Sequence, residues 1–215
     1  MIDLVVADPL PASFYARDAT EVAADLIGCI LRSEKGHGST EGRIVETEAY
    51  MGKEDLASHA ARLRTGRVVS LVGPVGVTYV YRSYGIHAML NAIAHGPGGT
   101  GAVLIRALQP LTGVEHMRAR RGGVPDRLLC AGPGRLCQAM GITLDDHDVD
   151  LTQRGPLLVY QSVGGAPPEI DVSGRIGISR AVDVPWRYFE ARNVYVSAHR
   201  RGTPLAQGRS ILGGA

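Results

Sequence analysis

Titratable side chains gather in one short stretch of the sequence, GRIVETEAYMGKEDLASH, which ends at His59. Glu46 and Glu48 lie among apolar residues in a part that is typical of a strand, and Tyr50 follows at the same spacing. Because alternate side chains of a strand point to opposite faces, these three are expected to share one face with Ile44. A carboxylate, a tyrosine and a histidine at a strand end and in its loop are the usual parts of a general acid–base site.

A carboxylate that is partly desolvated beside an aromatic ring can take a proton from a water molecule. The hydroxide equivalent that remains can then attack an electrophilic carbon, and no metal ion is needed. The alternative is a solvated strand face with two surface carboxylates, which the acidic turn and Ser58–His59 weaken by adding titratable groups nearby. Spacing alone does not choose between Glu46 and Glu48. His59 has no second histidine at ligand spacing, and the glycines form no phosphate-binding loop, so the sequence predicts no metal and no cofactor.

A second feature is the segment TYVYRSYGIHAMLNAI, which predicts two strands joined by a turn at RSYG. Tyr79 and Tyr81 would share one face of the first strand, and Gly85 would relax the turn. The turn would push Tyr84 outward, with Arg82 close by. Ordinary packing also accounts for tyrosines in strands. A protruding aromatic beside an arginine equally suits a wedge that enters a DNA groove and unstacks a base step.

Composition sets the limits within which these features act. The chain has 215 residues and is 45% hydrophobic, which suffices for one domain with a buried core. A net charge of +2 neither requires nor excludes a nucleic-acid partner. Three cysteines without CxxC spacing argue against a disulfide framework or zinc site and favour a reducing, cytoplasmic setting. Neither a signal peptide nor a membrane span is expected.

The elements that must position these residues follow from periodicity and capping signals. We expect helices at 18–28, 112–122 and 133–141, and strands at 29–34, 42–50, 77–81, 86–94, 102–110, 175–182 and 193–199. Residues 51–67 are expected to be a loop with one helical turn. Strands and helices do not alternate as βαβ units, so the chain is expected to be one α+β domain over residues 1–215. It would have a curved, largely antiparallel sheet, peripheral helices, a protruding β-hairpin, an N-terminal arm (1–17) and a flexible tail (203–215).

Together these segments resemble the alkyladenine (3-methyladenine) DNA glycosylase family, the methylpurine glycosylase type found in mammals and many bacteria. The resemblance covers most of the chain. It rests on ATEVAADLIGCIL, GRIVETEAYMGKEDLASHA, TYVYRSYGIHAMLN, AVLIRALQPLTG, CAGPGRLCQAMGI, and RIGISRA followed by PWRYF. The second block is the most specific, and several blocks in the same order make a chance match improbable.

The resemblance implies a monofunctional hydrolase that flips a damaged purine out of double-stranded DNA and hydrolyses its N-glycosidic bond, which initiates base excision repair. Its substrates would be alkylated or deaminated purines of the 3-methyladenine, hypoxanthine and ethenoadenine class. The reaction would use neither a metal nor a covalent lysine intermediate. We expect a monomer that acts on damaged DNA in the bacterial cytoplasm, associated with the nucleoid and with no membrane contact.

The resemblance also assigns roles to the residues of the first stretch. Glu48 matches the glutamate that positions and deprotonates the attacking water, which separates it from Glu46. Arg106 matches the arginine near that water and the flipped nucleotide. Tyr50 and His59 match residues that enclose the flipped base, and Tyr81 matches the aromatic on the other side of the pocket.

Two further positions are assigned at the hairpin. Tyr84 matches the intercalating tyrosine at the tip, and Asn91 matches the amide that disfavours normal guanine by crowding its exocyclic amine. Arginines are the expected contacts to the DNA backbone. The candidates are Arg64, Arg67 and Arg82, followed by Arg118, Arg120 and Arg121; each is alternatively a solvated surface residue.

The stretch 60–78 departs from the family pattern. An arginine–asparagine pair is replaced by Arg67–Val68, and a methionine–phenylalanine pair by Leu71–Val72. These changes affect the expected DNA-backbone contacts and the pocket floor, but not the water-activating group. A non-catalytic damaged-DNA binding protein of the same fold and a hydrolase of small nucleosides are the alternatives. Glu48 argues against the first alternative and Tyr84 against the second.

Overall fold

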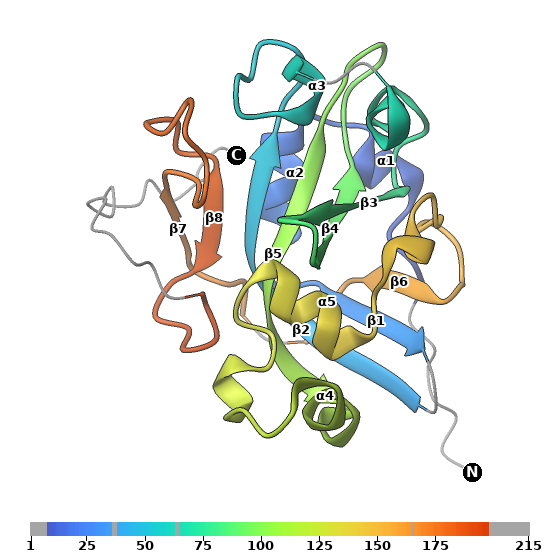
Figure 1. The fold of residues 1–215 in the computed structure, drawn as a ribbon, viewed down its shortest axis with the longest axis vertical. Helices are drawn as coiled ribbons and strands as arrows, with labels where there is room; N and C mark the ends of the chain where they lie inside the picture. The colour runs from blue at the N-terminus through green and yellow to red at the C-terminus, as the bar shows by residue number, and fades with distance from the viewer. Residues whose placement is uncertain (1–7, 36–37, 63–64, 165, 198–215) are drawn as a thin grey trace.

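A curled antiparallel sheet with helices packed around it forms the whole of the described molecule (Figure 1). The computed structural model describes residues 8–35, 38–62, 65–164 and 166–197. The sheet has eight strands, six of which follow the order β3-β4-β5-β2-β1-β6, while β8 pairs with β2 and β7 pairs with β8. This single mixed domain confirms the α+β class. The tail 203–215 and the first seven residues of the expected arm lie outside the described residues.

The strands are β1 (Ile30–Lys35), β2 (Gly38–Tyr50), β3 (Thr78–Ser83), β4 (His87–Ile93), β5 (Ala102–Thr112), β6 (Leu157–Tyr160), β7 (Ile170–Ser173) and β8 (Arg187–Glu190). The α-helices are α1 (Ala12–Tyr15), α2 (Ala19–Asp25), α3 (His59–Arg62), α4 (Val114–Arg121) and α5 (Pro133–Met140). Three short 3₁₀ helices are η1 (Gly66–Val72), η2 (Asp126–Leu128) and η3 (Leu144–Asp146). Among the described residues, no helix combines the length and the apolar character needed to cross a bilayer.

Strands β2 and β5 are the long central pair of the sheet, and irregular pairing between them decides where the carboxylates point. The register shifts between Ile44 and Glu46 and again between Glu46 and Thr47. As a result Ile44 packs in the hydrophobic core with Ala49, whereas Glu46 and Glu48 both contact an arginine of β5. Strict alternation from Ile44 to Tyr50 was therefore wrong at Ile44, because a bulged strand interrupts the two-residue period.

Helices α2 and α5 both pack against the sheet. Asp18 caps α2 by accepting a hydrogen bond from the Thr20 backbone at 2.9 Å, which satisfies a free donor at the start of the helix. The Thr47 hydroxyl donates to the Ala23 carbonyl at 2.7 Å and ties α2 to β2. Helix α5 ends at Gly141, whose φ of 72° is left-handed. It lies in front of the lower part of the sheet in Figure 1 and packs against β4 and β5.

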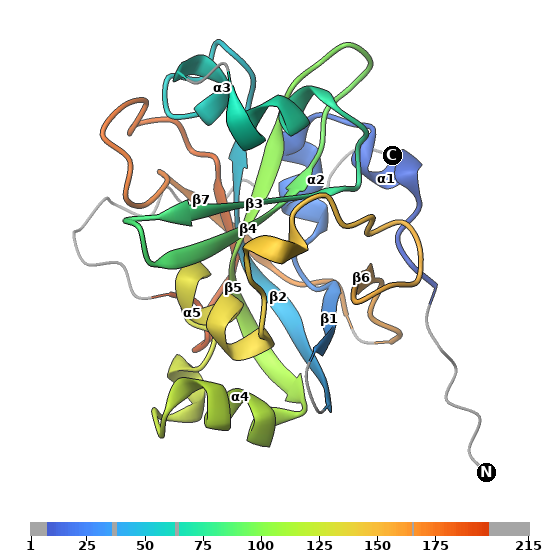
Figure 2. The ribbon, with the colours of Figure 1, turned by 45° about the vertical axis from the view of Figure 1, so that its right-hand side comes forward.

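The β3–β4 hairpin protrudes from the sheet beside the cavity described below (Figure 2). Its turn is closed by the Ile86 amide, which donates to the Ser83 carbonyl at 3.1 Å. Tyr84 and Gly85 have φ values of 50° and 73°, a pair of left-handed residues that fits the twist of a hairpin. Tyr84 is 88% exposed at the tip. The predicted protruding hairpin is thereby confirmed.

Two predicted late strands were wrong. Residues 175–182 form an irregular loop between β7 and β8, and residues 193–197 form turns, while residues 198–199 lie outside the described part. The strands that do form, β7 and β8, lie just before and just after the first of these segments. Apolar alternation alone cannot separate a strand from a loop that buries apolar side chains against a site.

Candidate active site

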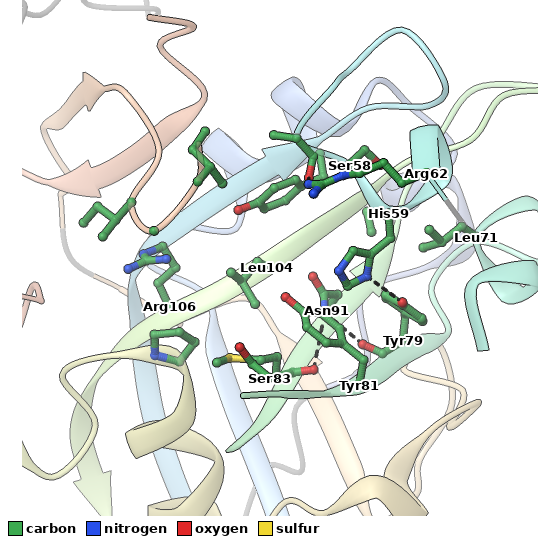
Figure 3. Close-up of a pocket in the computed structure, with 18 of the residues that line it drawn as sticks. Ser58, His59, Arg62, Leu71, Tyr79, Tyr81, Ser83, Asn91, Leu104 and Arg106 are labelled. Carbon is green, nitrogen blue, oxygen red and sulfur yellow. Dashed lines mark hydrogen bonds between the residues drawn. The ribbon is translucent and has the colours of Figure 1, made fainter. Parts of the chain in front are cut away.

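A cavity of about 360 Å³ opens where the ends of β2 and β5, the hairpin and the 175–182 loop meet (Figure 3). Its lining comes from β2, β3, β4 and β5, from α3, α5 and η1, from the hairpin turn and from two loops. Arg106 lies at one end of the view, and Leu71 and Tyr79 lie towards the other. Five residues that the resemblance marked line it: Tyr50, His59, Tyr81, Asn91 and Arg106, with Tyr84 at the rim.

Aromatic rings form one wall of the cavity. The His59 and Tyr81 ring centroids are 4.4 Å apart, and the Tyr79 and Tyr81 centroids are 5.5 Å apart. The His59 Nδ1 lies 2.8 Å from the Tyr79 hydroxyl oxygen. Burial and the nearby Arg62 charge lower the pKa of His59 below its ordinary value. His59 is therefore neutral at neutral pH and offers a flat, uncharged ring.

Asn91 is fixed by its own side-chain donors. Its Nδ2 donates to the Tyr79 carbonyl at 2.9 Å and to the Met89 carbonyl at 3.3 Å. Both amide hydrogens are therefore bonded to the backbone of the hairpin. The residue is buried, with 4% of its surface exposed. The amide that lines the cavity thus has its oxygen left to meet whatever enters.

Glu48 lies beneath the cavity, fully buried, with three polar contacts to its carboxylate. Its Oε2 accepts from the Tyr50 hydroxyl at 2.8 Å and lies 3.1 Å from Arg106 Nη1. Its Oε1 accepts from the Ile176 backbone N–H at 2.7 Å. All three of these residues line the cavity. A carboxylate has about four lone-pair sites, so Oε1 keeps room for one more donor.

Glu46 is equally buried but belongs to a different set of contacts. Its Oε1 accepts from Arg106 Nε at 2.9 Å, from Arg187 Nε at 2.7 Å and from the Ser197 hydroxyl at 2.9 Å. The Ser197 backbone N–H donates to its Oε2 at 2.8 Å. Burial alone would raise the pKa of Glu46, but the two arginine charges and the serine hydrogen bond outweigh it and lower that pKa. Glu46 therefore supports Arg106 rather than facing the cavity.

Tyr50 and Tyr81 are held in their protonated forms. Burial, and then the Glu48 charge, raise the pKa of Tyr50 well above its ordinary value. The same two causes raise the pKa of Tyr81 to about 12. The Tyr50 hydroxyl is thus a lasting hydrogen-bond donor to Glu48.

The arginines predicted to contact DNA are placed unevenly. Arg82 and Arg67 are exposed and line a hollow next to the cavity, together with Tyr84. Arg67 also donates to the Leu144 carbonyl at 3.0 Å. Arg64 lies outside the described residues. Arg118 instead forms an exposed two-bonded pair with Asp126, at 2.8 and 2.6 Å.

Sequence reasoning missed several side chains that complete the site. Arg187, Ser197 and the Ile176 amide reach the glutamates from positions more than 120 residues further along the chain, so no local spacing could indicate them. In the part of the chain that the structure describes, no group of three or more His, Cys, Asp or Glu side chains is arranged to hold a metal ion.

The site thus combines a curled antiparallel sheet, a cavity with an aromatic wall and a buried carboxylate–arginine pair next to it. Residues 13–194 match the family model of methylpurine-DNA glycosylase. The chain therefore belongs to the methylpurine-DNA glycosylase family, whose members are hydrolases of N-glycosyl bonds that act in the repair of alkylated DNA.

Relatives from distant organisms support this membership. A candidate 3-methyladenine DNA glycosylase of Granulibacter bethesdensis is 47% identical over 198 residues, which cover 91% of this chain and 90% of the relative. A protein of the same name from Methanoculleus marisnigri is 43% identical over 193 residues, covering 87% and 98%. One from Chlorobaculum parvum is 42% identical over 197 residues, covering 91% and 93%.

Proposed function

We propose that this protein excises alkylated and deaminated purines, of the 3-methyladenine, hypoxanthine and ethenoadenine class, from duplex DNA. The damaged nucleotide is flipped into the cavity, Glu48 takes a proton from a water molecule, and that water attacks the anomeric carbon of the deoxyribose. The base leaves with the electron pair of the N-glycosidic bond. The reaction takes place in the cytoplasm, on DNA bound by one copy of the chain.

The buried carboxylate carries the proposal. Glu48 makes three polar contacts, each with a residue that lines the cavity, and its Oε1 keeps a free site for a water. Arg106 Nη1, at 3.1 Å, pairs with the charge of this buried carboxylate. Cleavage passes through a sugar with oxocarbenium character, which a carboxylate also stabilises. A pure binding protein would gain nothing from a buried negative charge beside a phosphate-rich ligand.

The cavity suits one extruded base. Its volume of about 360 Å³ is at the lower end for small-molecule sites, roughly 300–1,000 Å³. Tyr50, His59 and Tyr81 all line it, and stacking against such rings binds any purine. Asn91 presents an amide that crowds the exocyclic amine of normal guanine. A cationic alkylated base leaves readily, whereas a neutral one depends more on activation of the water.

Single-turnover excision tests the proposal directly. The substrates are duplex oligonucleotides that carry one hypoxanthine or one ethenoadenine, and the proteins are wild type and Glu48→Gln. Wild type should leave abasic sites. The variant should bind the same duplex but excise at least about 100-fold more slowly, the scale of a lost general base.

Other outcomes point to other functions. Tight binding of the damaged duplex by wild type without cleavage would make the protein a damaged-DNA binder. Turnover of free nucleosides with no effect on DNA would make it a metabolic hydrolase. Either result would exclude the glycosylase reaction.

A further inference from the structure

Arg175 does not line the cavity, yet its side chain contacts the residues that hold Glu48. We propose that Arg175 is a positioning residue that places both hydrogen-bond donors to Glu48, the Tyr50 hydroxyl and the Ile176 N–H. This inference rests on the proposed role of Glu48 in the reaction.

The first step is that Arg175 itself is held firmly. Its Nη1 and Nη2 donate to the two carboxylate oxygens of Asp55 at 2.6 and 2.8 Å, and neither side chain is exposed. Nη1 also donates to the Ala49 carbonyl at 3.0 Å, between Glu48 and Tyr50 on β2. Asp55 is in turn fixed by the backbone N–H groups of Met51 and Ala57, at 3.1 and 3.0 Å. A two-bonded arginine–carboxylate pair sets orientation as well as distance.

The second step is the stack on Tyr50. The Arg175 guanidinium carbon lies 4.7 Å from the centre of the Tyr50 ring and 5.1 Å from that of Trp186. One face of Tyr50 is thus covered by a fixed planar cation, while the residue also lines the cavity. A ring held in this way keeps its hydroxyl on Glu48, at 2.8 Å. Arginine suits such stacking because its charge is spread over a plane.

The third step is the backbone next to Arg175. Ile176 follows it directly and donates its N–H to Glu48 at 2.7 Å. The loop 174–182 forms no strand that would hold this amide in place. Glycines flank the pair: a Cβ on Gly174 would lie 2.6 Å from the Val182 carbonyl oxygen, and Gly177 has a φ of 78°. The anchored Arg175 side chain is therefore the contact that holds the Ile176 amide on Glu48.

The Arg175 Nε supports the same view. It is buried and has no hydrogen-bond partner in the part of the chain that the structure describes. A buried donor without a partner is unfavourable. The contacts with Asp55, Ala49 and the stacked rings therefore determine where the guanidinium lies, although its Nε is left without a hydrogen bond.

The test compares Arg175→Lys and Arg175→Met with Arg17→Met as a matched control. Arg17 likewise donates to a carboxylate, of Asp25, at 2.8 Å and to a backbone carbonyl, of Phe14, at 2.9 Å, and it stacks on the Phe14 ring, but it does not line the cavity. On hypoxanthine duplex, both Arg175 variants should excise about 10- to 100-fold more slowly, the scale of a misplaced group. The control should stay within about threefold of wild type. Full activity of Arg175→Lys would overturn the proposal, because lysine keeps the charge but not the fork or the stack.

A double-mutant cycle with Tyr50→Phe separates positioning from general stability. Phenylalanine keeps the ring and removes the hydroxyl. If Arg175 acts through that hydroxyl, Arg175→Lys must slow excision less in the Tyr50→Phe background than in wild type. If the factors by which the two single substitutions slow excision simply multiply in the double variant, Arg175 does not act through Tyr50. That result would overturn this half of the proposal.

Hydrogen exchange of the Ile176 amide, followed by NMR, tests the other half without any need for activity. Exchange should be faster in Arg175→Lys than in wild type and unchanged in Arg17→Met; equal exchange in all three would overturn the assignment. If wild type excises nothing, the proposed function fails while this measurement still decides the positioning role. Should Arg175→Met not fold, Arg175→Lys and Asp55→Asn carry the same comparison.

Discussion

At the scale of single residues, the two glutamates of β2 have the same burial and different neighbours. Glu48 accepts hydrogen bonds from one tyrosine and one backbone amide and forms an ion pair with one arginine, all next to the cavity. Glu46 accepts from two arginines and from Ser197, away from it. Arg106 joins the two carboxylates, since its Nε contacts Glu46 and its Nη1 contacts Glu48. A change at Glu46 therefore reaches the proposed base through one shared side chain.

Glu46 should also make stability depend on pH in the acid range. Its pKa is lower in the folded protein than the ordinary value of 4.5. Between these two values the unfolded chain binds more protons than the native one, so stability rises with pH. The stabilising contribution of Glu46 is present above about pH 4.5. It is lost as the pH falls through the lower pKa that Glu46 has in the folded protein. Urea unfolding of wild type should accordingly show a falling free energy below about pH 4.5.

Glu46→Gln checks this origin. The variant leaves two buried arginines without their shared carboxylate, so at neutral pH it should be less stable by about 3–5 kcal/mol. The difference in unfolding free energy between the variant and wild type should become smaller in acid, because wild type then loses the same negative charge. Glu34→Gln is the control, since the Glu34 side chain is 54% exposed in its pair with Arg32 and should give a curve parallel to wild type. A constant gap for Glu46→Gln at all pH values would contradict the assignment.

At the scale of elements, the β3–β4 hairpin combines a left-handed turn with an exposed ring. A tyrosine at a φ of 50° is strained relative to glycine or asparagine at the same position. The turn thus retains a bulky aromatic where a smaller residue would be more stable. Tyr84 and its neighbour Ile86 are 88% and 73% exposed, as a wedge for a base step requires.

Tyr84→Asn should separate the ring from the turn. Asparagine tolerates the left-handed conformation, so the hairpin should stay folded and as stable as in wild type, or more so. Excision from damaged duplex should fall about tenfold or more, since flipping costs a few kcal/mol that the wedge no longer offsets. Excision from single strands, which need no unstacking of a duplex, should change little, and Tyr84→Phe should behave like wild type on both. An equal loss on duplex and single strands would remove the wedge role.

The sequence predicted elements better than it predicted contacts between them. The helix at 18–28, the central strands and the hairpin follow from capping signals, alternation and turn residues, which are local. Strict alternation failed at Ile44 because register shifts between β2 and β5 cannot be seen in one strand alone. The segment 175–182 looked like a strand because its apolar residues face the cavity from a loop, where Ile176 and Ile178 line it.

The candidate site shows the same limit. Tyr50, His59, Tyr81, Asn91 and Arg106 do gather around one cavity, which the resemblance implied and spacing did not. Arg175 and Arg187 were missed because their partners, Asp55 and Glu46, are 120 and 141 residues away in the chain. Arginines within otherwise apolar segments were the only local signal, since a buried arginine needs a carboxylate partner.

At the scale of the whole molecule, charge is distributed unevenly although the net charge is only +2. Three hollows meet around the hairpin: the cavity, the one with Arg67 and Arg82, and one between the hairpin and α5. Among the described residues that line them there is no aspartate or glutamate. The hollow beside β1 and β8 carries Glu169 and Glu190 in its lining. The hairpin side is therefore the face that suits a polyanion, without a strongly basic protein.

This uneven charge predicts how salt should act on binding to undamaged duplex. Each cation that neutralises a phosphate releases about one counterion, so the slope of log K against log salt counts these contacts. Arg82 is exposed, lines two of the three hollows and has no carboxylate partner among the described residues. Arg82→Met should weaken binding and reduce the slope by about one. Arg118→Met is the matched control, because Asp126 already neutralises Arg118; its slope should equal that of wild type. Equal slopes for all three proteins would mean that the duplex does not lie along the hairpin, and the charge argument for this face would fail with it.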